Sequence, residues 1–283
     1  MTLAAALTFF NQRLLSITDS GEASAITTLL LEHVVQIDRT AFHKLQGTLL
    51  TTEQLQQLSK LSEEVLTGKP LQYVLGESWF CGLKLTVNSQ VLIPRPETQE
   101  LVEWVITNCR FPVSELQVVD IGTGSGCIAL ALKRRIRKAK VTGVDIDAGA
   151  LSVARHNGLQ LGIDVEFVKA DLSDTTDWKQ IPNANIIVSN PPYISGAEKK
   201  AMSPTVLDHE PHLALFAPEA DPLFFYRKLV QLSEQKLKQE GQLFAELNAT
   251  YAEEIASLFR KANFQVAIKK DMQEKDRLLR AWR

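Results

Sequence analysis

Cysteine and histidine are scarce in this chain of 283 residues, which limits the chemistry available to it. The three cysteines, Cys81, Cys109 and Cys127, cannot all pair within one chain, and their spacing matches no metal site. The five histidines form no metal-binding pattern either. We therefore expect a protein of the reducing cytoplasm that has no bound metal.

Two further features are missing. No apolar run approaches the length of a membrane span, and the N-terminus lacks the charged and apolar regions of a signal peptide. The net charge of −2 gives no basic surface of the kind that binds nucleic acid phosphates. We expect a monomer without a membrane or a stable nucleic acid partner. The length suits two domains.

The first 72 residues predict a small helical domain. Leu3, Leu7 and Phe10 recur at helical spacing, and Thr51 with Gln54 forms a possible capping box before a further helix. Such stripes usually mean ordinary core packing, so we expect a docking domain rather than a catalytic one. Strand-like pieces in residues 73–93 predict a hairpin linker, and residues 94–283 form the remaining domain.

A glycine-rich turn predicts a nucleotide site in the third segment. The buried strand Val118–Ile121 leads into a loop of five residues and then into a helical pattern. The loop consists of Gly122, Thr123, Gly124, Ser125 and Gly126. A strand, a glycine turn and a helix form the first half of a nucleotide-binding βαβ unit. The third glycine of a dinucleotide site is replaced by Cys127, which disfavours a dehydrogenase; this glycine spacing is typical of methyltransferases.

Acidic residues follow the next two strands. Asp145 lies nineteen residues after Gly126, where it can accept hydrogen bonds from ribose hydroxyls. Asp171 and Leu172 follow the third strand, where an adenine ring would lie, although Asp171 could instead cap a turn. Asp120 either lies near the methionine amino group of a cofactor or ends its strand.

The tetrapeptide Asn190-Pro191-Pro192-Tyr193 follows another apolar strand. A carboxamide nitrogen is a poor nucleophile, because its lone pair is delocalised into the carbonyl. Two fixed acceptors, the side-chain oxygen of Asn190 and the carbonyl of Pro191, could hold both its hydrogens. Each precedes a proline and is therefore biased toward extended backbone. With the glycine loop, this motif predicts methyl transfer from S-adenosylmethionine to an amide or amino nitrogen, and Tyr193 could pack on the flat acceptor.

The rest of the chain predicts the fold. Residues 194–221 read as one long loop, a lid or substrate wall, in which His209 and Glu210 are more plausible as scaffold than as catalytic groups. Helix and strand patterns alternate again after residue 222. Repeated α/β units followed by late antiparallel strands indicate an α/β class I S-adenosylmethionine-dependent methyltransferase with a Rossmann-like seven-stranded sheet.

The chain resembles the release factor glutamine methyltransferases, the protein-(glutamine-N5) methyltransferase family. Five segments carry the resemblance: 68–76, Val91-Leu92-Ile93-Pro94-Arg95-Pro96-Glu97-Thr98, 120–129, 190–194 and 210–215. The second segment is the most specific, since Asn-Pro-Pro-Tyr also occurs in adenine methylases.

The resemblance implies that the substrate is the glutamine of the Gly-Gly-Gln loop in class 1 peptide-chain release factors. It implies that residues Gly122 to Gly126, Asp145 and the Asp171-Leu172 edge bind S-adenosylmethionine. Asn190 would touch both cofactor and substrate, and Pro191, Pro192 and Tyr193 would complete the glutamine pocket. The helical domain and hairpin would grip the release factor. Arg95 and Glu97 would brace the pocket, help to bind the cofactor, or pin the domain junction.

The sequence differs from the family pattern at two positions, and two alternative functions remain open. Gln99 replaces a common glutamate of the family, and Pro222 replaces a usual glycine after the lid. The first rival is an adenine-N6 methyltransferase acting on nucleic acid, which would need phosphate contacts and a flipped base. The second rival is a cofactor-binding module without catalysis. The near-neutral charge disfavours the first, and the intact Asn190 and glycine loop disfavour the second.

Overall fold

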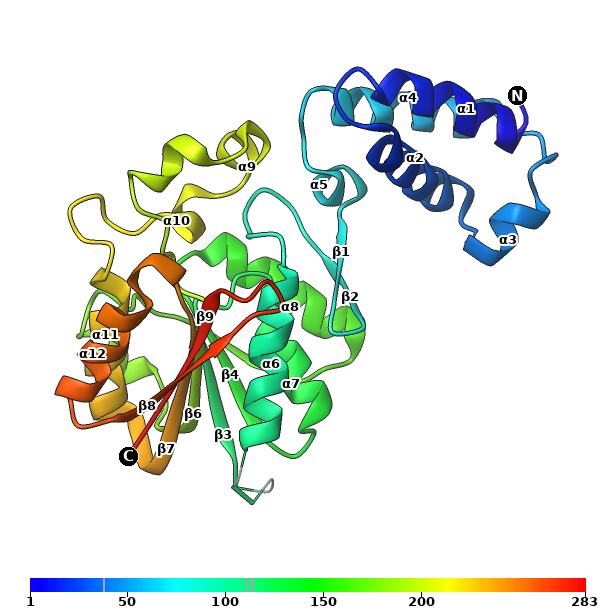
Figure 1. The fold of residues 1–283 in the computed structure, drawn as a ribbon. Coiled ribbons are helices and arrows are strands. Elements are labelled where there is room, and N and C mark those ends of the chain that lie inside the picture. Colours follow the sequence, from blue (N-terminus) through cyan, green and yellow to red (C-terminus); the bar gives the residue numbers. More distant parts are fainter. Residues whose placement is uncertain (38, 110, 113–114) are drawn as a thin grey trace. The chain divides into compact units, whose positions relative to one another are not determined.

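The computed structural model describes residues 1–37, 39–109, 111–112 and 115–283. They form two compact units, which are drawn in Figure 1. The first unit contains Met1–Gly76 together with Pro204–His209. The second contains Glu77–Ser203 and Glu210–Arg283.

The first unit is helical. Its helices are α1 (Leu3–Leu14), α2 (Ser20–Val35), α3 (Arg39–Lys44), α4 (Thr52–Leu66), α5 (Leu71–Leu75) and α9 (Pro204–His209). The capping box before α4 is confirmed: the Thr51 hydroxyl accepts from the Gln54 amide at 3.2 Å, and the Gln54 side chain accepts from the Thr51 amide at 2.9 Å. Leu3, Phe10 and Leu14 are buried as their spacing predicts.

The second unit contains a seven-stranded sheet of the predicted class. Its strands are β3 (Gln117–Ile121), β4 (Lys140–Asp145), β5 (Glu166–Lys169), β6 (Ala184–Ser189), β7 (Leu237–Glu246), β8 (Gln265–Lys270) and β9 (Asp276–Trp282). The order is β5-β4-β3-β6-β7-β9-β8. Neighbours from β5 to β7 are parallel, whereas β9 is antiparallel to β7 and β8.

Helices cover the sheet on two faces, with one apolar core on each (Figure 1). The helices are α6 (Pro96–Asn108), α7 (Cys127–Arg135), α8 (Ala148–Leu161), α11 (Phe224–Lys236) and α12 (Ala252–Lys261). Successive side chains of a strand point to opposite faces. Val118 accordingly packs with Leu101 of α6, and Val119 packs in the other core with Leu229 of α11. Because both faces are apolar, the polar side chains that do chemistry are left at the strand ends.

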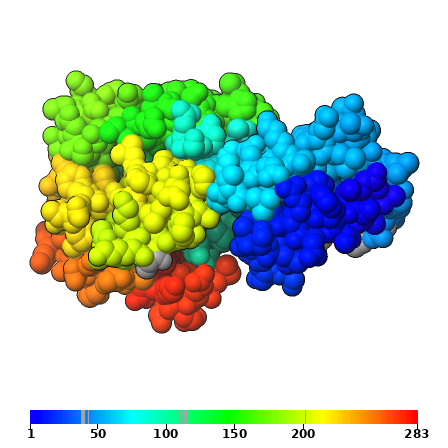
Figure 2. Space-filling model, turned by 90° about the horizontal axis from the view of Figure 1, so that it is seen from above, coloured from blue at the N-terminus to red at the C-terminus, as the bar shows by residue number. Residues whose placement is uncertain are grey.

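The segment after β6 differs from its prediction. Residues 194–221 are not one loop, since they contain η2 (Glu198–Ala201), α9 and α10 (His212–Leu215). Prolines at Pro204 and Pro211 suit the first turn or the cap of a helix, a signal that a loop prediction overlooks. The ends of the segment meet, because the Ile194 amide donates to Leu215 at 3.0 Å and the Ala217 amide donates to Ile194 at 3.1 Å. From above, residues 210–221 of this segment, drawn in yellow, lie against green segments of the same unit (Figure 2).

The predicted hairpin is present as β1 (Glu77–Phe80) and β2 (Leu83–Thr86), which are antiparallel. Residues 71–75 before it form α5. Residues 91–93 are irregular, although their apolar pattern predicts a strand-like piece. Two short 3₁₀ turns, η1 (Asp177–Gln180) and η3 (Ala249–Tyr251), complete the unit. Within the described residues, no helix combines the length and the apolar character needed to cross a bilayer.

The glycine at position 126 generates a prediction about stability. Gly126 has a φ of 81°, and a Cβ there would lie 3.1 Å from Leu130 and 3.2 Å from Ala154. Gly126→Ala should lower the free energy of unfolding by about 2–4 kcal/mol, because backbone strain and overpacking add. Urea unfolding measures the loss. Gly47→Ala is the control, since a Cβ there meets nothing within 4 Å, and equal losses in the two variants would contradict the prediction.

Candidate active site

The parallel strands end at a cavity of about 430 Å³. A cavity of this size is typical of a small-molecule site. Its walls contain residues 122–125 after β3, 145–147 after β4, 170–173 after β5 and 189–192 after β6. Residues 90–92, 94 and 95 before α6, together with Pro211, Leu213 and Ala214, also line it. Four separate strand ends thus contribute to one cavity.

The glycine loop is held by the end of β4. The amides of Gly122 and Thr123 donate to the Val144 carbonyl at 2.8 and 2.9 Å. The Gly124 amide donates to one oxygen of Asp145 at 2.8 Å, and the Asp147 amide donates to the other at 3.0 Å. Burial raises the pKa of Asp145 above its ordinary value. Each carboxylate oxygen can accept a second hydrogen bond, so Asp145 retains acceptors at the cavity wall.

Asp120 is a buried support behind the loop. One of its oxygens accepts from the Thr123 hydroxyl at 2.7 Å and from the Ala129 amide at 3.2 Å. The other oxygen is buried and has no hydrogen-bond partner among the described residues. Burial raises the pKa of Asp120 to about 7. Asp120 therefore ties the loop to the first turn of α7.

Of the two sequence interpretations of Asp171, the turn is the one that the hydrogen bonds show. Its carboxylate accepts from the amide and from the hydroxyl of Ser173, both at 2.7 Å, which is the hydrogen bonding of a turn aspartate. Asp171 and the half-buried Leu172 also line the cavity. The turn fixes the strand end against which a flat ring could pack.

Asn190, Pro191 and Pro192 line the cavity next to the glycine loop. The Asn190 side-chain nitrogen donates to the Thr98 hydroxyl at 3.2 Å, and that hydroxyl donates to Glu246 at 2.7 Å. Thr98, which also lines the cavity, is on α6, and Glu246 ends β7, so three distant segments meet at the tetrapeptide.

Tyr193 lies behind the cavity wall and is not among the described residues that line it. Its hydroxyl donates to Glu246 at 2.9 Å, and its carbonyl accepts from the Asn248 side chain at 3.1 Å. The Arg277 guanidinium lies 5.9 Å from the centre of its ring. Burial raises the pKa of both Tyr193 and Glu246.

No pattern in the sequence predicts the contact between Thr98 and Asn190, and Glu246 and Asn248 were not predicted to take part in the site. One signal was available for Glu246, because it is a carboxylate at the end of an otherwise apolar run, Leu243–Ala245. A charged residue in such a position is expected only where it is paired or hydrogen-bonded.

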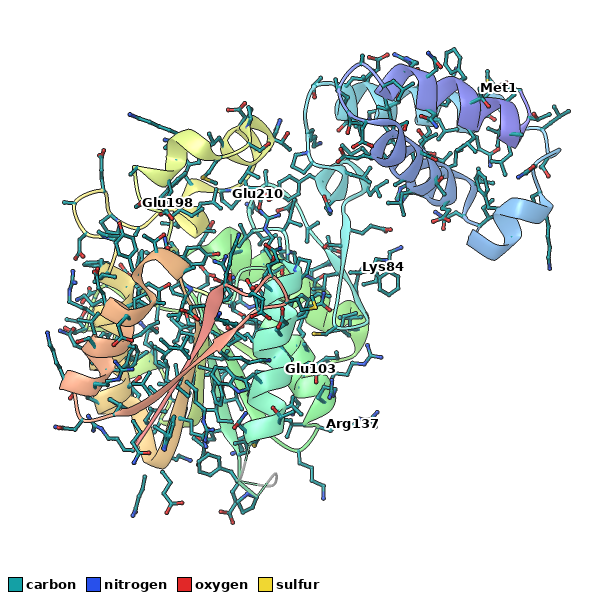
Figure 3. All side chains as sticks on the ribbon, viewed as in Figure 1. Met1, Lys84, Glu103, Arg137, Glu198 and Glu210 are labelled. Atoms are coloured by element: carbon teal, nitrogen blue, oxygen red, sulfur yellow. The ribbon has the colours of Figure 1, made fainter. Side chains whose placement is uncertain are left out.

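Arg95 and Glu210 join two of the five segments that carry the family resemblance. The Arg95 guanidinium and the Ile93 amide both donate to the Glu210 carboxylate, the latter at 3.2 Å. The Glu210 side chain is 1% exposed and that of Arg95 is 35% exposed, so only the carboxylate is removed from water. Glu210 and Glu198 both lie above the sheet edge in Figure 3, on the segment after β6. Arg95 thus braces the cavity wall, while Glu97 accepts from Gln273 at 3.3 Å.

The doubly covered sheet, the glycine turn with its acidic partner, and Asn-Pro-Pro-Tyr at the adjoining strand end define a class I S-adenosylmethionine-dependent methyltransferase. Comparisons with known proteins agree. The methyltransferase small domain family matches residues 98–212, and the PrmC N-terminal domain family matches residues 5–76.

Relatives named release factor glutamine methyltransferase match nearly the whole chain. The one from Flavobacterium psychrophilum is 40% identical over 276 residues, which is 96% of each chain. The one from Bacteroides thetaiotaomicron is 36% identical over 274 residues, covering 96% of this chain and 97% of the relative. The chain belongs to the release factor glutamine methyltransferase family, as its motifs predict.

A solved structure supports the fold alone. A methyltransferase from Pyrococcus furiosus has a TM-score of 0.53 and 19% identity, and the match covers 79% of this chain and 98% of that one.

The buried Asp120 generates a prediction about pH. Its pKa rises from 3.8 unfolded to about 7 folded, so its contribution to stability is complete below pH 3.8 and is lost as the pH rises through about 7. Asp120→Asn retains an acceptor for Thr123 and carries no charge. Between pH 5 and 8, the variant should gain about 2 kcal/mol of unfolding free energy relative to the wild type. Urea unfolding at several pH values measures this, with the exposed Asp164→Asn as control; parallel curves for Asp120→Asn and wild type would refute it.

The Arg95–Glu210 pair generates another prediction. Arg95→Met leaves the Glu210 carboxylate buried without its cation, which should lower the free energy of unfolding by about 2 kcal/mol. The loss is smaller than for a fully buried pair, because the Arg95 side chain is partly exposed. Glu210→Gln in the same chain should recover part of the loss by removing the unpaired charge. Denaturant unfolding compares the single and double variants, and a double variant less stable than Arg95→Met would argue against this account.

Proposed function

We propose that this chain transfers a methyl group from S-adenosylmethionine to the side-chain amide nitrogen of the glutamine in the Gly-Gly-Gln motif of class 1 release factors. The observation that carries the proposal is the orientation of Asn190, whose nitrogen is occupied by Thr98. Its oxygen is then available as an acceptor at a cavity that the glycine loop also lines.

The cavity fits the cofactor that this class of enzyme uses. Gly122, Thr123, Gly124, Ser125 and Gly126 would form the turn that receives it. The free lone pairs of Asp145 suit ribose hydroxyls, because a carboxylate accepts and hydroxyls donate. Asp171 and Leu172 would hold the adenine, and Asn190 would contact both cofactor and substrate. The volume of about 430 Å³ supports this assignment.

The substrate carboxamide would be held by two acceptors. The Asn190 side-chain oxygen takes one N–H, and the carbonyl of Pro191 takes the other. Pro192 completes the pocket wall, and Tyr193 stiffens the tetrapeptide from behind through its bond to Glu246. Two acceptors reject a group that cannot donate twice, so a primary amide is selected over an ester or a carboxylate.

The residues act by placing the nitrogen rather than by moving protons. S-adenosylmethionine supplies an electrophilic methyl group on a positively charged sulfur. When bound, it would give that methyl group to the acceptor nitrogen and leave as S-adenosylhomocysteine, and the nitrogen would release one proton to water. Fixing both hydrogens limits rotation of the amide and aims its lone pair. Orientation of this kind is worth up to about 7–11 kcal/mol of a barrier.

We further propose that residues 1–72 dock the release factor and that residues 73–93 link this docking domain to the methyltransferase domain, residues 94–283. The match of residues 5–76 to a separate family of N-terminal domains supports a distinct role for this part. Action in the cytoplasm as a monomer, with no stable nucleic acid partner, completes the proposal.

The decisive variant is Asn190→Ala. It should lower methyl transfer at least about 100-fold, because the amide loses one of its two acceptors, while the melting temperature changes little. Gln180→Ala removes an exposed carboxamide as the control. Labelled S-adenosylmethionine is supplied with a purified release factor, its Gly-Gly-Ala variant, or duplex DNA. Label in the DNA, or in the factor irrespective of that glutamine, would overturn the assignment.

A further inference from the structure

Behind Asn190 lies a chain of hydrogen bonds with a fixed direction. Asn190 donates to Thr98, and Thr98 donates to one oxygen of Glu246. Tyr193 donates to the other oxygen of Glu246. Thr98 is 2% exposed and Glu246 is 2% exposed, so water cannot readily replace either partner. All of these contacts lie within the second unit.

The direction follows from the chemistry of the terminal group. An ionised carboxylate can only accept hydrogen bonds. The single hydroxyl proton of Thr98 is therefore committed to Glu246, which leaves Thr98 only lone pairs to offer Asn190. A carboxamide facing a lone pair must present its NH₂ group. The Asn190 oxygen consequently turns away from Thr98.

We propose that Glu246 and Thr98 are positioning residues for methyl transfer: the Glu246 carboxylate sets the direction of the chain, and so presents the oxygen of Asn190, rather than its NH₂ group, to the acceptor nitrogen. The proposal rests on the proposed function of Asn190. If the Asn190 side-chain amide were rotated by 180°, its NH₂ group would face the NH₂ group of the substrate. Such a site would repel a primary amide.

Burial of Glu246 raises its pKa, and its hydrogen bonds with Thr98 and Tyr193 oppose that rise. Arg277 of β9 favours its charge, whereas Glu97 of α6 opposes it. Tyr193 and Thr98 donate to its side chain, and Tyr226 of α11 donates to its backbone carbonyl at 3.1 Å. A protonated Glu246 could donate to Thr98 and would permit the reversed direction.

The test compares Thr98→Val with Thr98→Ser. Valine preserves the shape and removes the hydroxyl, so Asn190 is free to rotate, and kcat should fall about 100-fold. Serine restores the hydroxyl and should restore kcat to within a few-fold of the wild type. A merely structural role for Thr98 would lower the melting temperature of both variants and leave kcat per folded enzyme unchanged.

The pH profile supplies a second readout. In the wild type, kcat should fall as the pH drops through the raised pKa of Glu246. In Thr98→Val this fall of kcat at low pH should disappear, because the Glu246 carboxylate is no longer connected to Asn190 through the Thr98 hydroxyl. An unchanged fall in the variant, or kcat equal to that of the wild type, would overturn the proposal.

Failure of the proposed function looks different. Wild-type enzyme that labels another acceptor bearing a planar NH₂ group, such as adenine in DNA, would refute the release factor assignment. The ratio of kcat for Thr98→Val to kcat for Thr98→Ser, measured on that acceptor, would still test the positioning role. Any planar NH₂ group needs the Asn190 oxygen as its acceptor.

Discussion

The parallel register of three strands is the constraint on which the site depends. Ile121 at the end of β3 lies opposite Val144 of β4 on one side and Ser189 of β6 on the other. The next residue of each strand is Gly122, Asp145 or Asn190, so the three side-by-side strands deliver them to one edge of the sheet. A shift of one residue in either pairing would move the side chains of the shifted strand to the opposite faces of the sheet. It would also separate the glycine loop from Asp145 or Asn190.

Buried carboxylates hold this edge together. Asp120 fixes the glycine loop to α7, Glu210 joins the segment after β6 to the segment before α6, and Glu246 joins α6 to the Asn-Pro-Pro-Tyr tetrapeptide. All three groups lose hydration on burial. Hydrogen bonds or a cation compensate Glu210 and Glu246, whereas one oxygen of Asp120 has no hydrogen-bond partner among the described residues. The surrounding structure therefore has little freedom to rearrange, which suits a site that acts by orientation.

The parts of the fold and site that were predictable are those encoded by neighbours in sequence. The first half of the βαβ unit follows from an apolar strand, a glycine turn and a helical repeat within residues 118–135. The helix cap at Thr51 follows from a four-residue pattern. Residues 194–221 were mispredicted as one loop because η2 and α10 are only four residues long and carry no periodicity. Thr98 and Glu246 are 148 positions apart, and no local pattern announces their contact.

The sequence by itself determined the class of sheet, the identity of the chemical groups and the family, because hydrophobic periodicity, glycine turns and short motifs are local properties of the chain. Only the tertiary structure decided which way those groups face. The direction of Asn190 depends on a hydroxyl from α6 and a carboxylate from β7, and their approach is set by the packing of whole elements. Hydrogen bonds are short-ranged and directional, so their geometry exists only after the chain has folded.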